Sequence, residues 1–324
     1  MKAVVCEAFG GPEVLALREV PDPPPPGPGE VQVRIRARGV QYVDVLMLAG
    51  KYQFRPDPPF VPGNEGAGEV VAVGPGVTRF KVGDPVMSRH RLGAFAELGN
   101  APAENCDRVP AGLSLDEAAV FRGAYTTAYH ALLQRGRLKP GDRVLIHGAA
   151  GGIGLPAIQI AKLHGAEIIA TASTDEKRAV CLAEGADHAI PYHDGFRDKV
   201  MELTAGGGVD IIYDPVNGPT FEESLRCLAW SGRILILGFL GGAPALARTN
   251  YLLIKGIEAI GVRIGGLNEN HPEIAAANTE ALLDLAAQGK LKPRIWRRYP
   301  MAQAAEAVQA LIDRAVIGKA VLTG

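Results

Sequence analysis

Residues 144–154 decide the fold, because they read V-L-I-H-G-A-A-G-G-I-G, an apolar strand followed by a turn rich in glycine. The apolar spacing after this turn predicts a helix over Ile153–His164, which Gly165 ends. Glycines in such a turn let the backbone approach a pyrophosphate, which then binds at the N-terminus of the helix. A plain strand-to-helix turn can also contain glycines, so the interpretation as a dinucleotide site depends on the surrounding elements.

Strands and helices alternate from about Asp142 onward, which is typical of a parallel, doubly wound sheet. The predicted strands are Val144–His147, Glu167–Ala172, Asp187–Ile190, Val209–Asp214, Ile234–Gly238 and Ile257–Arg263. The predicted helices between them are Ile153–His164, Thr174–Glu184, Phe196–Thr204 and Thr220–Ala229. A strand, a glycine turn, a helix and a second strand thus follow in the order of a dinucleotide-binding unit. The sequence therefore predicts an α/β fold with a Rossmann sheet.

The chain before about residue 120 differs, with short extended runs separated by glycine and proline that predict a β-rich domain. The predicted strands here are Lys2–Glu7, Leu15–Val20, Glu30–Arg38, Gly68–Val73, Asp84–Ser88 and Ala94–Leu98. In the tail we expect helices over Pro272–Gln288 and Ala302–Arg314 and strands over Pro293–Arg297 and Lys319–Leu322. The pattern alone does not indicate which domain the tail joins.

Composition and charge disfavour several classes of protein. The 324 residues include 34 Lys plus Arg and 35 Asp plus Glu, for a net charge of −1. Proteins that bind nucleic acid through its phosphates usually carry a basic excess, so no nucleic-acid partner is expected. The longest uncharged apolar stretch, Ile234–Ala247, is too short for a membrane span, and no signal peptide is recognised. We expect a cytoplasmic protein with no membrane partner, whose four widely spaced cysteines are buried small hydrophobes.

The end of the second predicted strand indicates which dinucleotide binds. NAD-binding folds usually place an acid there to hold the ribose 2′-hydroxyl, whereas this chain has Ala172. Without an acid a 2′-phosphate is not repelled, and Ser173 and Lys177 can supply a hydroxyl donor and a positive charge. Asp175 and Glu176 argue for NAD, but the run from Ser173 to Glu176 also fits a helix capping box. We therefore expect NADPH (NADP) as the cofactor.

Six motifs extend the interpretation to nearly the whole chain. They are G-V-Q-Y-V-D at 39–44, P-G-N-E-G-A-G-E-V at 62–70, V-G-D-P-V at 82–86, T-A-Y at 127–129, L-K-P-G-D-R-V-L-I-H at 138–147 and G-K-A-V-L at 318–322. In these motifs the chain resembles the medium-chain dehydrogenase/reductase superfamily, and within it the zinc-free quinone oxidoreductase branch that includes zeta-crystallin. The resemblance implies a GroES-like catalytic domain over 1–122, a Rossmann dinucleotide-binding domain over 123–264 inserted into it, and a C-terminal segment over 265–324 that returns to the catalytic domain. It also implies an active site in the cleft.

The resemblance bears on metal as well. Zinc-using alcohol dehydrogenases of this superfamily carry a Cys ligand where this chain has Gln41, and a His-Glu pair where it has Asn64-Glu65. Amides are poor zinc ligands beside thiolate and imidazole, so no metal is expected. Cys106 is the one cysteine between Phe80 and Val120, where a structural zinc lobe needs four. Without a Lewis acid the expected reaction is hydride transfer from NADPH to a quinone or an α,β-unsaturated carbonyl.

Candidate site residues follow from the resemblance. Gln41 and Tyr42 would line the cleft, where an amide or a phenol can hydrogen-bond a carbonyl that gains negative charge. Tyr52 and Arg263 are further candidates on the side of the acceptor, although each can equally be a packing or surface residue. His147 is expected to be a packed residue with one hydrogen bond. The cofactor-binding candidates are Thr127, Ala150, Gly151, Gly152, Ile153, Gly154, Ser173, Lys177, Tyr192, Val216, Phe239 and Leu240.

Three classes of function stay open. The favoured class is an NADPH-dependent reductase of a small-molecule quinone or enone. The second is an enoyl or acryloyl thioester reductase, for which Arg89, Arg91 and Arg263 would bind the phosphates of coenzyme A. The third is a non-enzymatic, NADPH-binding structural or RNA-binding protein, which the neutral charge disfavours.

Assembly is predicted from the last two strands of the Rossmann sheet, Ile234–Gly238 and Ile257–Arg263, one of which should form its edge. An apolar exposed edge tends to pair with another chain. The resemblance implies an isologous homodimer through this edge. The alternative is that the tail or the loop Gly242–Asn250 covers the edge and leaves a monomer.

Overall fold

The computed structural model describes residues 1–193 and 195–324, which divide into two compact units. Unit 1 comprises residues 1–123 and 283–324, and unit 2 comprises residues 124–282. The sequence places the return to the first domain at 265, whereas residues 265–282 belong to unit 2. The physical reason is visible at Asn278, whose side-chain amide exchanges hydrogen bonds of 2.7 and 3.1 Å with that of Gln134.

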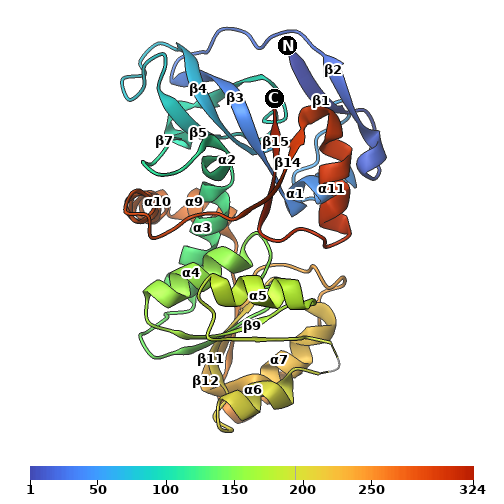
Figure 1. Cartoon of the computed structure of the whole chain (residues 1–324), viewed down its shortest axis with the longest axis vertical. Coiled ribbons are helices and arrows are strands. Elements are labelled where there is room, and N and C mark those ends of the chain that lie inside the picture. The colour runs from blue at the N-terminus through green and yellow to red at the C-terminus, as the bar shows by residue number, and fades with distance from the viewer. Residues whose placement is uncertain (194) are drawn as a thin grey trace. The chain divides into compact units, whose positions relative to one another are not determined.

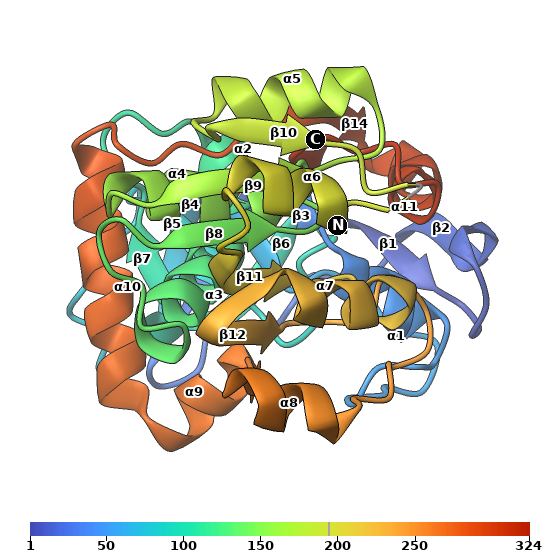
Figure 2. The ribbon, with the colours of Figure 1, turned by 90° about the horizontal axis from the view of Figure 1, so that it is seen from below.

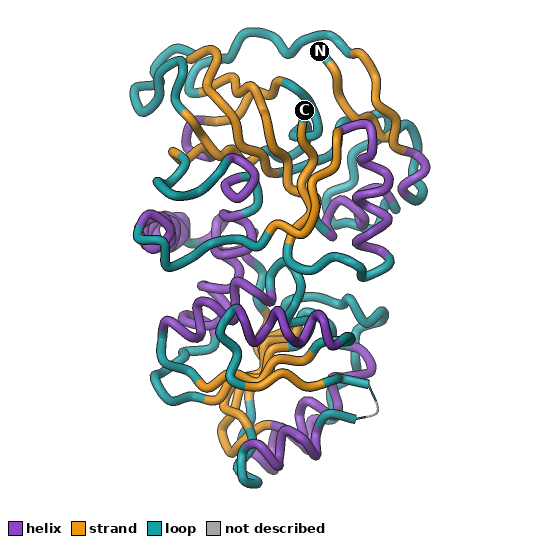
Figure 3. The backbone as a smooth tube through the Cα atoms, viewed as in Figure 1, coloured by secondary structure: helices purple, strands orange, loops and turns teal. Residues whose placement is uncertain are grey.

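Unit 1 is built around a seven-stranded, mostly antiparallel sheet in the order β14-β15-β3-β4-β5-β7, with β6 paired to β3. The antiparallel pairing of Ala320 with Val40 joins the tail to β3, so the tail strands belong to this domain. The bounds are β3 Glu30–Val40, β4 Glu65–Val73, β5 Pro85–Arg89, β6 Leu98–Pro102, β7 Cys106–Arg108, β14 Ile295–Pro300 and β15 Lys319–Thr323, with a separate hairpin of β1 Lys2–Cys6 and β2 Leu15–Glu19. Strands dominate this unit (Figure 3), as the sequence predicts.

Helices are short in unit 1. They are η1 Pro12–Val14, α1 Tyr42–Leu48, η2 Ala103–Asn105, α2 Leu115–Ala118, η5 Met301–Gln303 and α11 Ala304–Ile312, while α3 Phe121–Tyr129 and α10 Pro272–Ala287 cross the division between the units. The sequence analysis does not predict α1, whose run Y-V-D-V-L-M-L is apolar on nearly every side. Tertiary contacts bury Asp44, Met47 and Leu48 of this helix, and a capping box between Gln41 and Asp44 begins it.

Unit 2 contains a six-stranded sheet in the order β10-β9-β8-β11-β12-β13, and every neighbouring pair is parallel. The strands are β8 Arg143–Ile146, β9 Glu167–Thr171, β10 His188–Ile190, β11 Val209–Asp214, β12 Leu228–Ile236 and β13 Glu258–Gly261. The remaining elements are η3 His130–Arg135, α4 Gly154–Leu163, α5 Asp175–Ala183, α6 Arg197–Leu203, η4 Gly218–Thr220, α7 Phe221–Cys227, α8 Thr249–Lys255 and α9 Ile264–Asn270. Helices α4 and α5 cover one face of the sheet, and α6 and α7 the other (Figures 1 and 2). The predicted doubly wound α/β fold is confirmed, and β13 forms one edge.

Two predicted strands are wrong in position. Of the predicted strand Ala94–Leu98, only Leu98 belongs to the sheet, because the paired strand is β6, Leu98–Pro102. Phe95 is instead buried under the hairpin, and its carbonyl accepts a hydrogen bond of 2.8 Å from the Val4 amide. The run is apolar because other parts of unit 1 bury it. Hydrophobic periodicity in the sequence cannot distinguish such a buried segment from a paired strand. Strand β12 begins at Leu228 rather than Ile234, since α7 already ends at Cys227.

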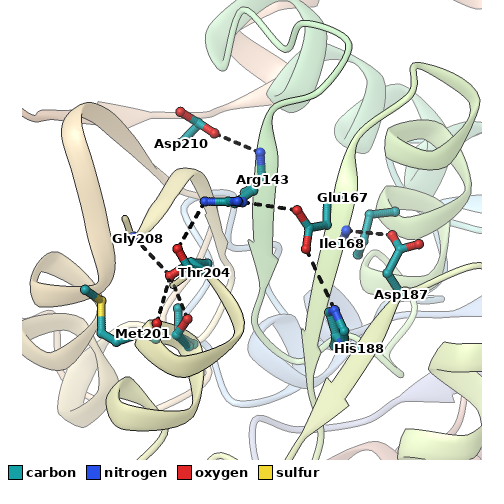
Figure 4. A network of polar contacts seen from close by, with 10 residues as sticks. Arg143, Glu167, Ile168, Asp187, His188, Met201, Thr204, Gly208 and Asp210 are labelled. Carbon is teal, nitrogen blue, oxygen red and sulfur yellow. Dashed lines mark hydrogen bonds and ion pairs between the residues drawn. The ribbon is translucent and has the colours of Figure 1, made fainter. Parts of the chain in front are cut away.

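A polar network holds the amino ends of the strands in unit 2 (Figure 4). The Nε of Arg143 lies 3.1 Å from Glu167 Oε2, and its Nη1 donates to the Thr204 carbonyl at 3.3 Å. Asp187 Oδ2 accepts the Ile168 amide at 2.9 Å. These contacts pair ends of β8 and β9 that would otherwise expose unpaired groups. They leave the opposite, carboxyl edge of the sheet for the loops that follow each strand, which is where ligands bind in such sheets.

All four cysteines, Cys6, Cys106, Cys181 and Cys227, are buried and free, which confirms their prediction as small hydrophobes. Burial raises the pKa of Cys106, Cys181 and Cys227 to about 12, so these thiols stay protonated. Among the described helices none is both long and apolar enough to cross a membrane. The cytoplasmic location stays a prediction.

Candidate active site

The glycine turn between β8 and α4 presents unpaired backbone amides. A Cβ on Gly154 would lie 2.4 Å from the Ala149 carbonyl oxygen and 2.6 Å from that of Gly148, so glycine is required at this position. The hydroxyl of the buried Tyr213 on β11 donates to the Ile153 carbonyl at 3.2 Å and fixes the turn from below. Within residues 1–193 and 195–324 the amides of Gly152 and Ile153 have no acceptor. They are free to bind an anion where α4 begins.

The end of β9 is contacted by an arginine, Arg178, that the sequence analysis does not name. Ala172 is buried, and Ser173 and Lys177 follow it, both partly exposed. The N-cap of α5 is Thr174, whose side chain accepts the Lys177 amide at 3.2 Å. The predicted capping box that starts at Ser173 is therefore wrong, and the Ser173 hydroxyl is not used as the cap. Arg178 donates to the Ala172 carbonyl at 3.2 Å and also pairs with Asp175.

The sequence analysis does not name Arg178 as a candidate, because an Arg on an amphipathic helix is usually a solvated surface residue. Its spacing from Asp175 was the available signal, since residues three apart on a helix are neighbours. The ion pair balances the charge of Asp175, one of the two acids that argue for NAD. Lys177 and Arg178 are thus the two cations of this strand end.

Loops after β11 and β12 bring three further candidates together. Asp214 Oδ1 accepts the amides of Val216 and Asn217 at 2.9 and 2.7 Å, which turns the chain sharply at the end of β11. The Val216 carbonyl accepts the Gly241 amide at 2.7 Å, so the loop after β12 packs on the first one. Phe239 and Leu240 lie in this second loop, and the Phe239 side chain is half exposed. Val216, Phe239 and Leu240 thus share the carboxyl edge of the sheet.

Two other cofactor candidates lie in the same unit. Thr127 is a partly buried residue of α3. Tyr192 follows β10, is partly buried, and stacks on His193 with ring centroids 4.0 Å apart. Tyr192 also packs against the apolar core of unit 2, so its ring has a structural role whatever its hydroxyl binds.

His147 and Arg263 differ from their predictions. His147 is buried and makes two hydrogen bonds instead of one, to Thr171 Oγ1 at 3.0 Å and Ser224 Oγ at 2.9 Å. Burial lowers its pKa, so the ring is a neutral structural link between β8, β9 and α7. Arg263 does not end a strand, because β13 stops at Gly261. It occupies the position before α9 without a side-chain capping hydrogen bond, and it pairs with Glu269 at 3.0 Å. Its exposed side chain is satisfied on the surface.

In unit 1, Gln41 belongs to a partly buried polar cluster that the sequence analysis did not recognise as one. The side-chain Nε2 of Gln41 donates to Asn64 Oδ1 at 2.9 Å, and its backbone amide donates to Asp44 Oδ2 at 2.8 Å. Glu65 is 4% exposed and faces Lys319, with Nζ and Oε1 3.8 Å apart. We call Gln41, Asp44, Asn64, Glu65 and Lys319 the amide–carboxyl cluster. The signal in the sequence was the position of Asp44 and Glu65, each inside a largely apolar run. A carboxyl group is rarely buried unless it is paired.

Electrostatics in the amide–carboxyl cluster are set by burial. Burial raises the pKa of Asp44 to about 7, with the Glu65 charge adding to the rise and the Gln41 amide opposing it. Burial also raises the pKa of Glu65, while Lys319, Arg89 and the side-chain amide of Gln41 pull it down. Both carboxyls lie within electrostatic reach of Lys319, and Glu65 lies within reach of Arg89 as well.

The tyrosine candidates differ in their surroundings. Tyr42 begins α1 and is 40% exposed. Tyr52 is partly buried and lies within electrostatic reach of Arg89, a largely desolvated guanidinium whose pKa burial lowers. Arg89 pairs in register with Glu65 across β4 and β5, and both line a small cavity with Ser88. Tyr52 and the amide–carboxyl cluster are thus linked through Arg89.

No group of three or more His, Cys, Asp or Glu suited to a metal ion occurs in the described part of the chain. His188 lies 3.8 Å from Glu167 and has no third ligand among those residues.

Comparisons with known proteins agree with this geometry. The family described as "Alcohol dehydrogenase GroES-like domain" matches residues 27–131, and "Zinc-binding dehydrogenase" matches residues 152–281. Quinone oxidoreductase of Pseudomonas aeruginosa is 37% identical over 323 residues, 99% of both chains. Human quinone oxidoreductase is 33% identical over 96% of this chain and 94% of its own. The crystal structure of Escherichia coli quinone oxidoreductase complexed with NADPH matches with a TM-score of 0.92, 32% identity and full coverage of both chains.

The sequence motifs, the fold and these relatives lead to one assignment. The chain is an oxidoreductase and belongs to the zinc-free quinone oxidoreductase branch of the medium-chain dehydrogenase/reductase superfamily.

Proposed function

We propose that the protein uses NADPH to reduce a quinone or an α,β-unsaturated carbonyl, and that it does so without a metal. The observation that carries this proposal is the hydrogen bond between Gln41 and Asn64, because two paired amides stand where zinc dehydrogenases need ligands. An amide pair neither binds zinc well nor replaces its Lewis acidity. Reactions that need only hydride transfer and a polarised carbonyl suit such a site.

The nucleotide half of the proposal rests on unit 2. The unpaired amides of Gly152 and Ile153 would bind the pyrophosphate, since they stand at the N-terminus of α4. Ser173, Lys177 and Arg178 would bind the 2′-phosphate at the end of β9, where no acid stands. Tyr192, Val216, Phe239, Leu240 and Thr127 would contact the rest of the cofactor. A relative complexed with NADPH, from Escherichia coli, supports the choice of dinucleotide.

When bound, NADPH supplies the hydride, so the protein has to orient the acceptor and stabilise its charge. The amide–carboxyl cluster offers uncharged donors at a place made rigid by α1 and β4. Tyr42 and Tyr52 offer aromatic surface for a flat acceptor such as a quinone. Arg263 is not part of this proposal, because Glu269 pairs with it.

A panel assay tests the function. Oxidation of NADPH is followed with 1,2- and 1,4-quinones, simple enones and enoyl thioesters, before and after dialysis against a strong chelator. We expect turnover with quinones or enones that dialysis leaves unchanged. The matched variant Lys177→Ala should lower activity at limiting NADPH and not at saturation. Turnover confined to enoyl thioesters would favour the second class, and chelator-sensitive turnover would contradict the metal-free proposal.

For thioester reduction the decisive residue is Arg89. Of the three arginines that would bind coenzyme A phosphates, Arg91 stacks over the Phe54 ring at 3.8 Å and Arg263 pairs with Glu269. Arg89 is largely desolvated beside Tyr52, which leaves little room for a phosphate in contact with water. Because Arg91 and Arg263 already contact other side chains and Arg89 is desolvated, the thioester class stays second.

We also propose that two copies of the chain pair through β13. The strand is the edge of its sheet, and Glu258, Ala259 and Gly261 are exposed, so no loop of the described chain covers it. Val262 continues the ladder to Ile236 on the inner side and leaves the outer side for a partner. An antiparallel pairing about a two-fold axis would bury this edge in both copies.

A further inference from the structure

We propose that Asn217 is a positioning residue for NADPH, which holds the loop after β12 against the loop after β11. This inference rests on the proposed function, because Val216, Phe239 and Leu240 of these two loops are the residues proposed to contact the cofactor. Asn217 itself is not among the candidates from the sequence. All of the contacts that carry the inference lie within unit 2.

The backbone of Asn217 has a conformation that residues with a side chain rarely adopt. Its φ is 55° and its ψ is −154°, close to a region of backbone conformations that is occupied almost entirely by glycine. The residue is only 2% exposed. Such a conformation persists where the surrounding contacts impose it, and it is most frequent at functional sites. The side chain of Asn217 must therefore supply something that glycine would not.

The side-chain oxygen of Asn217 accepts hydrogen bonds from two backbone amides. Oδ1 lies 2.9 Å from the Gly218 nitrogen and 2.8 Å from the Ala245 nitrogen. Because a backbone N–H can only donate, these two partners fix which end of the Asn217 amide is the oxygen. The first bond is local and begins η4, whereas the second spans 28 positions and joins the two loops.

The bond to Ala245 is the last of a series that runs along the two loops. Three bonds between backbone groups precede it, from the amides of Leu237, Leu240 and Gly241 to the carbonyls of Asp214, Pro215 and Val216 at 3.0, 3.1 and 2.7 Å. A Cβ on Gly241 would lie 2.8 Å from the Asn217 carbonyl oxygen, so the two backbones are in contact here. Asn217 continues the series with a side chain where the loops are connected to Ala245.

This bond restrains the part of the second loop that carries two cofactor candidates. Phe239 and Leu240 lie between the bonded residues Leu237 and Ala245, so the loop is held on both sides of them. Without the bond from Ala245 the loop would have more conformations, of which only a fraction could bind the cofactor. The dissociation constant of NADPH would then rise by the reciprocal of that fraction.

Two substitutions at Asn217 separate the role of the side chain from that of the backbone. Asn217→Ala and Asn217→Gly both remove the acceptor for Ala245, but only glycine also relieves the strain at positive φ. By titration of NADPH fluorescence, we expect both variants to bind the cofactor about fivefold more weakly than wild type, as the loss of one hydrogen bond predicts. Asn217→Gly should nevertheless melt about 2–4 °C above Asn217→Ala.

Hydrogen exchange measures the contact between the loops in the absence of cofactor. The Ala245 amide should exchange about tenfold faster in both variants, because it has lost its acceptor. The Gly241 amide is the internal control, since its acceptor is the Val216 carbonyl, and it should stay protected.

Ala205→Gly is the matched control for relief of strain. Ala205 also has a positive φ, of 50°, and lies between α6 and β11, before the amino end of that strand. Its side chain has no hydrogen-bonding group. The substitution should raise the melting temperature and leave both NADPH affinity and exchange of the Ala245 amide at wild-type values.

The outcomes distinguish this inference from the proposed function. If wild type binds NADPH and Asn217→Ala binds it equally well, the inference is overturned and the proposed function stands. The same holds if affinity follows stability, with Asn217→Gly binding more tightly than Asn217→Ala, or if the Ala245 amide stays protected in both variants. Failure of wild type to bind NADPH rejects the proposed function and overturns the inference with it.

Discussion

Asp44 is expected to make the stability of unit 1 fall as pH rises, and Asp44→Asn should remove most of that dependence. Asp44 lies in α1 with no exposed surface, and its Oδ1 has no partner within the described part of the chain. Burial raises its pKa from 3.8 to about 7. The substituted amide cannot ionise, and its oxygen can still accept the Gln41 amide that caps the helix.

The sign and size follow from the difference in pKa between the folded and unfolded chain. A carboxyl with a raised folded pKa binds its proton more tightly in the folded state, so its contribution is complete below the unfolded value of 3.8 and is lost as pH rises through about 7. A difference of about 3 units corresponds to about 4 kcal/mol at about 1.36 kcal/mol per unit. Glu65, whose pKa is also raised, adds loss of the same sign.

Urea unfolding at a series of pH values measures this effect in unit 1 alone. The chain has 2 tryptophans, with Trp230 in unit 2 and Trp296 in unit 1. Trp230 is 75% exposed, so Trp230→Phe should leave a folded background in which Trp296 fluorescence reports unit 1. We expect the free energy of unfolding to fall between about pH 4 and about pH 8 in this background, and to fall much less with Asp44→Asn.

A control of opposite sign exists in the same unit. The Arg108 side chain and the Lys81 amide lower the pKa of Asp84, so its contribution is present above its unfolded pKa and lost as pH falls. Asp84→Asn should therefore flatten the acid side of the profile only. An equal pH slope in wild type and Asp44→Asn would refute the reasoning, and the double variant with Glu65→Gln shows how much slope Glu65 supplies.

The remaining predictions concern the cofactor, the metal and assembly. Lys177→Ala should weaken NADPH binding about 10- to 10²-fold and leave NADH nearly unchanged, because one charge-assisted hydrogen bond contributes roughly 1.5–3 kcal/mol. Titration of cofactor fluorescence measures both, and equal losses would contradict the 2′-phosphate role. Elemental analysis of the purified protein should find no stoichiometric zinc, and a full equivalent would disprove the metal-free proposal. Sedimentation at micromolar concentration should show a dimer of the 34.1 kDa chain. Ala259→Pro, which removes a donor from the exposed edge β13, should weaken that dimer, whereas an indifferent dimer would place the contact elsewhere.

The doubly wound sheet of unit 2 could be predicted from the sequence because its signals are local. Apolar runs such as Val209–Asp214, helical periodicity and the glycines of the turn each act over a few residues. The absence of an acid at the end of the second strand is likewise a local signal, because it concerns the single position Ala172, and Ala172 directly follows β9 in the structure. The sequence located elements less well in two places. At Phe95 a buried loop segment has the apolar pattern of a strand, and in α1 the run is too uniformly apolar to show helical periodicity.

The amide–carboxyl cluster depends on contacts between distant parts of the chain, which no local pattern encodes. Gln41 and Asn64 are 23 positions apart, and Lys319 reaches Glu65 from the opposite end of the sequence. Each looks like an ordinary polar residue until β15 pairs with β3 and β3 with β4, which places them in one cluster. The sequence by itself determined the fold class, the glycine turn and the family. Only the tertiary structure decided that these polar residues share one cluster, because the strand pairings that bring them together join distant parts of the chain.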